Sequence, residues 1–229
     1  MRLDKFVAKA ADIPRSKAKK LIISGKVSVD QDICKSTGLL ISDQQSIELF
    51  GRALCYVQQQ YILLNKPKGY ICSTKDEQYP SALNLLDTIS LANLHFAGRL
   101  DVDTSGLVLI SNDGQWTHRV TSPKHRYEKR YIVSTSEAVS SEQRQKLTRG
   151  VILKDSDNPT LPAITETISE KVISLTITEG RYHQVKRMLA AVGNHVIGLH
   201  RQSIGRLIIE DEMAVGDWRY LSKEEISWF

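Results

Sequence analysis

The chain has 229 residues, of which 41% are hydrophobic and 25% charged, as is typical of a globular protein of one or two domains. No apolar run approaches the ~20 residues that a transmembrane helix needs, and the charged N-terminus lacks a signal-peptide core, so we expect a cytoplasmic protein with no membrane partner. The three cysteines, Cys34, Cys55 and Cys72, form no CxxC pair, and with six scattered histidines they predict neither a disulfide framework nor a metal site. The net charge of +5 favours a polyanionic partner.

The positive charge is concentrated in two stretches that contain no Asp or Glu. The first, residues 15–26, holds Arg15, Lys17, Lys19, Lys20 and Lys26. The second, residues 181–209, holds Arg181, Lys186, Arg187, Arg201 and Arg206. Two stretches of one sign suggest two contact surfaces for a single anionic ligand.

The first elements predicted along the chain are two short helices. Apolar residues at positions 3, 6, 7 and 10 have the spacing of one helix face. After the break at DIP, Ser16 is expected to cap a second helix whose lysines point outward. Gly25 is expected to end that helix, and a small β-element is predicted from Lys26 to residue 50.

The stretch RSKAKKLIISGKVSV resembles the core of the S4 RNA-binding domain, which consists of two helices and a β-hairpin. The resemblance implies that residues 1–58 form a small N-terminal S4-like RNA-binding domain. Its outward cations, Arg15, Lys17, Lys20 and Lys26, would then hold phosphates and position RNA without reading its sequence. The alternative is a charged helix face that only contacts solvent.

Residues 59–229 are predicted to form a second domain. Strand signals occur at residues 61–66, 107–110, 131–133, 172–178 and 204–209, and helix signals at residues 112–123 and 183–193. Because strands and short helices follow one another without a regular βαβ repeat, we expect an α+β fold rather than a doubly wound sheet.

Four motifs follow one another in this second domain, namely NKPKG, HFAGRLDVDTSGLVLISNDG, EKRYIV and EGRYHQVKRMLAAVGN. With the S4-like segment ahead of them, they resemble the pseudouridine synthases of the RsuA type over nearly the whole chain. The resemblance implies a catalytic domain with a mixed or antiparallel sheet, and isomerisation of a uridine in RNA to pseudouridine with no cofactor and no metal. That reaction breaks the N1–C1′ bond, turns the uracil and joins C5 to C1′.

The GRLD motif ends in Asp101, just ahead of the apolar strand 107–110. Breaking a glycosidic bond builds positive charge on the sugar, which a carboxylate can stabilise or capture. By resemblance Asp101 is the nucleophile, and attack on the sugar and attack on the uracil ring both remain open. Asp103 is expected to stabilise the turn. A hydrolytic glycosidase with two carboxylates is the alternative, and it would need one acid of raised pKa.

Two further residues match functional positions of the family. By resemblance, Arg99 contacts the RNA and helps to keep the target nucleotide extruded, because a stacked base cannot be turned. An ion pair with Asp103 is its alternative role. Tyr131 matches the active-site tyrosine, whose ring would stack on the flipped uracil and whose hydroxyl could transfer a proton.

The last motif requires a choice between two cations. On a helical wheel the apolar stripe that begins at Val185 leaves Lys186 on its flank and Arg187 nearly opposite. Lys186 also aligns with the family's basic partner of the catalytic aspartate, often an arginine, so we expect it beside Asp101 and Arg187 on the RNA. His183 is expected to form a hydrogen bond or to face RNA. The other predicted RNA contacts are Lys66, Lys129, Arg130 and Arg181.

The EGRYHQVKRM version of the last motif resembles the enzyme that modifies uridine 516 of small-subunit 16S rRNA. Large-subunit relatives tend to have an Asn-Arg pair at this point. We therefore expect a monomer that acts on ribosomal RNA within an assembly particle. The alternatives are a large-subunit (23S) rRNA synthase of the same family, a non-catalytic S4-type assembly factor, and a nucleoside hydrolase-like glycosidase.

Overall fold

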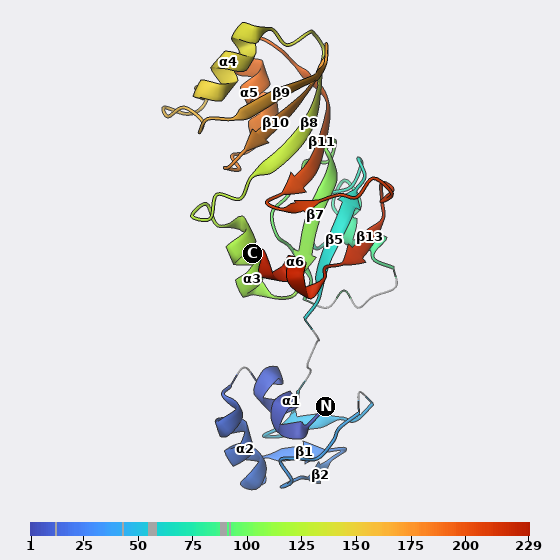
Figure 1. Cartoon of the computed structure of the whole chain (residues 1–229). Helices are drawn as coiled ribbons and strands as arrows, with labels where there is room; N and C mark the ends of the chain where they lie inside the picture. The colour runs from blue at the N-terminus through green and yellow to red at the C-terminus, as the bar shows by residue number, and fades with distance from the viewer. Residues whose placement is uncertain (12, 43, 55–58, 88–90, 92) are drawn as a thin grey trace. The chain divides into compact units, whose positions relative to one another are not determined.

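The computed structural model describes residues 1–11, 13–42, 44–54, 59–87, 91 and 93–229, so Cys55 lies outside the described residues. The chain divides into two compact units, Met1–Gln58 and Gln59–Phe229 (Figure 1). No helix in the described ranges is both long enough and apolar enough to cross a membrane.

The first unit places two helices against a small antiparallel sheet. Its elements are α1 (Leu3–Ala10), α2 (Arg15–Ile23), β1 (Val27–Val29), β2 (Asp32–Ile33), β3 (Ile47–Leu49) and β4 (Arg52–Ala53), with the strand order β2-β1-β3-β4. Leu3, Val7, Ala18 and Ile22 are fully buried, which confirms the predicted inner faces of both helices. The predicted cap is wrong: α2 begins at Arg15 after Pro14, and its N-terminus has no side-chain cap. Ser16 lies one residue inside the helix.

The second unit contains a mixed sheet with the strand order β13-β5-β7-β11-β8-β10-β9. The strands are β5 (Tyr61–Lys66), β6 (His95–Phe96), β7 (Ser105–Ser111), β8 (Lys129–Thr135), β9 (Ile164–Ser169), β10 (Val172–Ile177), β11 (Val196–Ile204), β12 (Leu207–Ile208) and β13 (Trp218–Tyr220). Strands β7 and β11 are parallel and the other paired strands are antiparallel. This arrangement confirms the α+β prediction with a mixed sheet.

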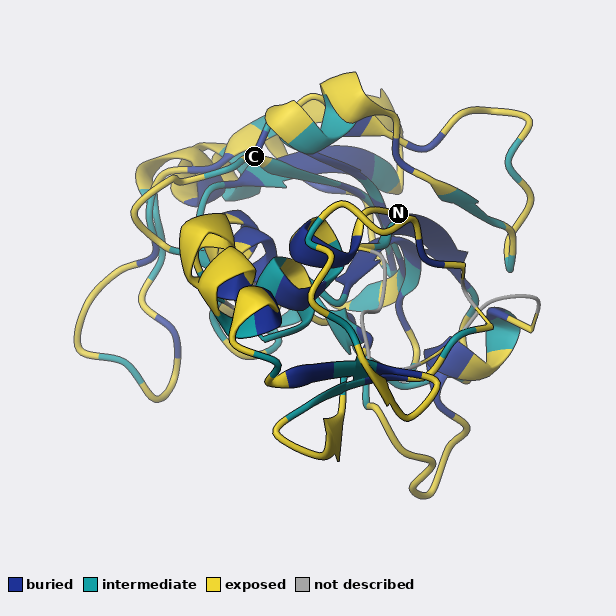
Figure 2. Ribbon diagram, turned by 90° about the horizontal axis from the view of Figure 1, so that it is seen from below, coloured by how far each residue is buried: buried dark blue, intermediate teal, exposed yellow. Residues whose placement is uncertain are grey.

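Both faces of this sheet are covered at β5 and β7, which explains their continuous apolar sequences. The helical elements of the unit are η1 (Ala82–Leu85), α3 (Gly114–Thr121), α4 (Ser141–Arg149), α5 (Gln184–Ala191) and α6 (Lys223–Ser227). One core contains Ile62 and Val108 together with Met188 from α5. The other contains Leu63 and Leu109, the neighbours of those strand residues, together with Trp116 from α3. Figure 2 shows the outward turns of the helices as exposed and much of the strands as buried.

Two sequence-based predictions in this unit need correction or extension. The predicted strand 204–209 is a hairpin instead, because Gly205, with φ +56°, reverses the chain between β11 and β12. Helix α4 was not predicted, although Ser140 and Gln143 form a capping box at its start. The predicted helices around residues 112–123 and 183–193 are confirmed as α3, capped by Asp113, and α5.

Candidate active site

Asp101 lies in the loop between β6 and β7, and the NKPKG turn forms a backbone hydrogen bond with that loop. The amide of Gly69 donates to the carbonyl of Val102 at 2.7 Å. The amide of Leu100 donates to Cys72 Sγ at 3.4 Å. The backbone on both sides of Asp101 is therefore fixed by a second segment of the chain, which limits the positions that its carboxylate can take.

Lys66, at the end of β5, stabilises the same turn from the interior. Its Nζ donates to the carbonyls of Pro67 at 2.9 Å and Tyr70 at 2.7 Å. Burial lowers the pKa of the Lys66 ammonium, although the negative charges of Asp101 and Asp103 oppose that shift. Because the side chain is fully buried, the prediction that Lys66 contacts RNA is wrong. It closes the turn that holds the Asp101 loop.

Gly106 anchors the other end of the loop at the parallel pairing of β7 and β11. Its φ is +112°, and a Cβ at this position would lie 2.3 Å from the carbonyl oxygen of Arg201. Only glycine allows the two backbones to approach this closely. The SGLVLI segment therefore fixes the register of the Asp101 loop against the strand that carries Arg201.

Lys186, on α5, bridges two carboxylates. Its Nζ lies 2.9 Å from Asp101 Oδ2 and 2.6 Å from Asp103 Oδ1. Partial burial lowers the pKa of Lys186, but the hydrogen bonds to Asp103 and Asp101 outweigh it, so the net shift is upward. The same hydrogen bond from Lys186 lowers the pKa of Asp103. Asp103 thus pairs with Lys186, and both carboxylates face a lysine that is protonated at neutral pH.

His183 reaches the same carboxylate from the start of α5. Its Nε2 lies 3.3 Å from Asp101 Oδ1. The residue has φ +48° and ψ +34°, a left-handed conformation that non-glycine residues adopt rarely. This turn places the side chains of His183 and Lys186 on opposite oxygens of Asp101. A hydrogen-bonding or RNA-facing role was expected for His183, and no pattern in the sequence indicates its contact with Asp101.

Tyr131, on β8, is only 8% exposed and points to the α5 side of the sheet. Its hydroxyl oxygen lies 3.5 Å from Nη1 of Arg201, a long contact, and the same Nη1 lies 3.5 Å from the carbonyl of Arg99. Nε of Arg201 donates to the carbonyl of Leu107 at 2.8 Å. Arg201 thus joins Tyr131 to both sides of the Asp101 loop. It was expected on an exposed basic surface, and its 3% exposure corrects that expectation.

The remaining predicted RNA contacts of this unit have different surroundings. Arg130 points to the opposite face of the sheet from Tyr131 and pairs with Glu166 at 2.8 Å. Lys129 donates to the carbonyl of Tyr127 at 3.0 Å, and burial lowers its pKa. Arg99 is exposed on the Asp101 loop. Arg99 thus lies on the loop that carries Asp101, whereas Arg130 lies on the opposite face of the sheet from Tyr131.

Arg181 and Arg187 both contact the segment between α4 and β9. Arg181 pairs with Glu179 at 3.1 Å and donates to the carbonyls of Asn158 and Pro159. Since its guanidinium stabilises this loop, the predicted RNA contact of Arg181 gains no support from the geometry. Arg187 lies 3.4 Å from Asp155 and does not reach Asp101, as the helical wheel predicted.

In the first unit, the basic stretch is organised around a buried acid. Asp4 is 0% exposed, and its carboxylate accepts hydrogen bonds from Arg15 at 2.9 Å and from Arg2 at 3.3 Å. The hydrogen bond from Arg15 lowers the pKa of Asp4. Lys17, Lys20 and Lys26 are exposed. The stretch thus carries more positive charges than the single Asp4 carboxylate neutralises, which leaves a positively charged surface.

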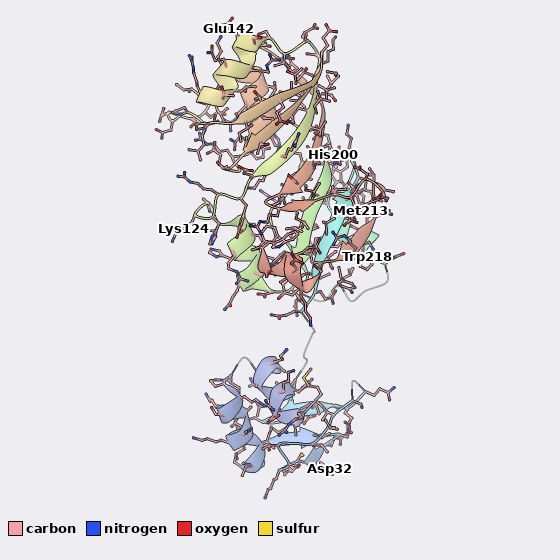
Figure 3. The ribbon with its side chains drawn as sticks, viewed as in Figure 1. Asp32, Lys124, Glu142, His200, Met213 and Trp218 are labelled. Atoms are coloured by element: carbon pink, nitrogen blue, oxygen red, sulfur yellow. The ribbon has the colours of Figure 1, made fainter. Side chains whose placement is uncertain are left out.

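His200, on β11, contacts a residue outside the Asp101 site. His200, labelled in Figure 3, forms a hydrogen bond of 3.0 Å with Ser105 Oγ, and burial lowers its pKa. This contact is one more bond between β7 and β11, which fits a structural role.

Comparison with known proteins decides what these residues belong to. Residues 60–191 match the RNA pseudouridylate synthase family and residues 1–45 match the S4 domain. This chain belongs to the RNA pseudouridylate synthase family. It is 46% identical to Ribosomal small subunit pseudouridine synthase A of Vibrio cholerae over 227 residues, which cover 99% of this chain and 98% of that protein.

Further relatives agree with this membership. The protein of the same name from Escherichia coli (strain K12) is 43% identical over 228 residues, 99% of each chain. A crystal structure of a pseudouridylate synthase superposes with a TM-score of 0.72 at 42% identity, covering 99% of this chain and 98% of that one. The protein is therefore a pseudouridine synthase, an isomerase, with an N-terminal S4 domain.

Proposed function

We propose that this pseudouridine synthase isomerises a uridine of small-subunit ribosomal RNA, uridine 516 of 16S rRNA, with Asp101 as the nucleophile. The observation that carries the assignment is the Asp101 carboxylate, which lies on a loop fixed by the NKPKG turn and 2.9 Å from Lys186. The names of the full-length relatives support the small-subunit substrate. We further propose that the enzyme acts as a monomer in the cytoplasm, on rRNA within an assembly particle.

The proposed chemistry begins with the target nucleotide extruded from its stack, because the uracil must turn. As the N1–C1′ bond breaks, Asp101 stabilises or captures the positive charge that develops. The uracil turns, C5 joins C1′, and C5 loses its proton while N1 gains one. Lys186 orients Asp101, because its Nζ lies within hydrogen-bond distance, 2.9 Å, of Oδ2.

The other residues of the site support the bound nucleotide. In this proposal the ring of Tyr131 would contact the uracil face, and its hydroxyl would take part in proton transfer. Arg99, exposed on the catalytic loop, would contact the RNA backbone and hold the nucleotide outside the helix. Arg15, Lys17, Lys20 and Lys26 would bind phosphates and position the RNA.

The experiment that tests this proposal incubates the purified protein with 16S rRNA, free and in a partly assembled small-subunit particle, and with 23S rRNA. Pseudouridine at one small-subunit position is the expected product. Asp101→Asn should abolish it while RNA affinity and the folded state are retained, because the amide keeps the shape but is no nucleophile. Product in 23S rRNA alone would identify the large-subunit alternative. Free uracil would indicate the glycosidase, and unchanged RNA the assembly factor.

A further inference from the structure

The aromatic side chain that stacks on His183 has no role in the proposed reaction. Tyr182 is 72% exposed, the second most exposed large hydrophobic residue in the described part of the chain. Its ring stacks on His183 with a centroid distance of 3.8 Å and an angle of 22° between the planes. His183 in turn lies 3.3 Å from Asp101. An exposed aromatic face therefore stands two contacts away from the proposed nucleophile.

The position of Tyr182 is set by the backbone around it. The left-handed conformation of His183, with φ +48°, ends the preceding segment just before α5 begins. The carbonyl of Tyr182 accepts a hydrogen bond from Nη1 of Arg187 at 3.2 Å. With one side of its ring covered by the imidazole and its backbone held by Arg187, Tyr182 offers the other side to solvent in a fixed orientation.

We propose that Tyr182 is a stacking platform for an unpaired nucleobase adjacent to the target uridine. Extruding one nucleotide removes the stacking partner of its neighbours. Proteins that bind unpaired RNA offer aromatic faces to such bases, because every base has a π-face. The Tyr182–His183 stack has the flat surface, the exposure and the nearness to Asp101 that this role requires. The assignment of the ligand as RNA rests on the proposed function.

This role predicts a distinctive set of effects. Stacking on one base contributes ~1–3 kcal/mol, so Tyr182→Ala should raise the RNA concentration for half-maximal rate by roughly 5- to 150-fold. Since the side chain is neutral, the slope of log affinity against log salt should not change. Tyr182→Phe and Tyr182→Trp keep an aromatic face and should retain most of the affinity.

The test measures RNA binding by fluorescence anisotropy over a range of salt, and pseudouridine formation, for the full chain and a 16S rRNA fragment that contains the target uridine. Tyr220→Ala is the matched control, because Tyr220 is 50% exposed on β13, an edge strand of the sheet. The proposal is overturned if Tyr182→Ala binds as tightly as the unchanged protein, or if Tyr182→Phe is as weak as Tyr182→Ala. It is also overturned if Tyr220→Ala loses as much affinity.

The binding arm does not depend on turnover. If the unchanged protein forms no pseudouridine in the RNA, the proposed function is overturned. The measured RNA affinities would still decide the role of Tyr182. Normal turnover together with unchanged affinity in Tyr182→Ala would overturn the stacking role alone. Because Tyr182 is largely exposed, its truncation leaves no cavity, and the urea unfolding midpoint should stay where it was.

Discussion

Replacing Lys186 by Met tests the ion pairs at the centre of the site. The ammonium lies 2.9 Å from Asp101 and 2.6 Å from Asp103, and methionine keeps much of the length of the lysine stem while it removes the charge. The side chains of Lys186 and Asp101 are 26% and 27% exposed. The pair is thus neither a surface pair nor a buried one.

The magnitude follows from this intermediate exposure. Exposed ion pairs contribute ~0–1 kcal/mol, and removing one partner of a buried pair costs ~3–5 kcal/mol. For Lys186→Met we expect a loss of about 2 kcal/mol of transition-state stabilisation, since His183 still contacts Asp101 and water reaches part of the carboxylate. That loss corresponds to a roughly 30-fold lower rate at saturating RNA.

The assay is single-turnover formation of pseudouridine, with RNA affinity measured separately. Lys186→Arg should keep much of the rate, because the charge remains and only the geometry of the contact changes. Arg187→Met is the matched control: its guanidinium lies 3.4 Å from Asp155 and not on Asp101. Its rate at saturation should stay within a few-fold of normal. The reasoning is refuted if Arg187→Met abolishes turnover with binding unchanged and Lys186→Met is nearly silent.

Three further predictions concern the parts that support the site. Neutralising Arg15, Lys17 and Lys20 together should reduce the slope of log RNA affinity against log salt by roughly 0.7–0.9 for each phosphate that is no longer neutralised. Neutralising Lys146, which pairs with Glu142, should leave this slope unchanged. An unchanged slope in the triple variant would mean that the three cations contact only solvent. Gly106→Ala should lower the free energy of unfolding of the second unit by about 3 kcal/mol in urea, because the new Cβ strains the backbone and collides with Arg201. Gly114→Ala, which has open space around it, should change this free energy little. Equal effects of the two substitutions would contradict this prediction. Asp4 has a folded-state pKa below its ordinary value of 3.8, so its contribution to stability is present above that pH and is lost as pH falls through the lower folded value. The protection of the α1 and α2 amides from exchange, measured relative to the intrinsic exchange rate at the same pH, should fall as the pH falls below about 4, and less so in Asp4→Asn. Identical acid profiles for the two proteins would exclude this linkage.

Elements whose pattern is local can be predicted from the amino-acid sequence alone. The apolar stripe of α5 and the Asp113 cap of α3 follow directly from the sequence, because helix periodicity and capping depend only on neighbours along the chain. The wheel of α5 also separated Lys186 from Arg187, since two adjacent helical residues differ in direction by a fixed angle. The order of the motifs sufficed to indicate the family.

The tertiary structure decided the features that depend on distant segments. Lys66 reads as a surface cation in NKPKG, but its position at the end of a strand that is covered on both faces buries it. Arg201 reads as part of a basic stretch, but the parallel pairing of β11 with β7 turns it into the core beside Tyr131. The contact of His183 with Asp101 needs a left-handed residue that no periodicity predicts. The charge of a side chain follows from the residue type, so the sequence shows which residues are charged. Whether a charged side chain is buried, and which groups it contacts, depends on the packing of β5, β7 and β11.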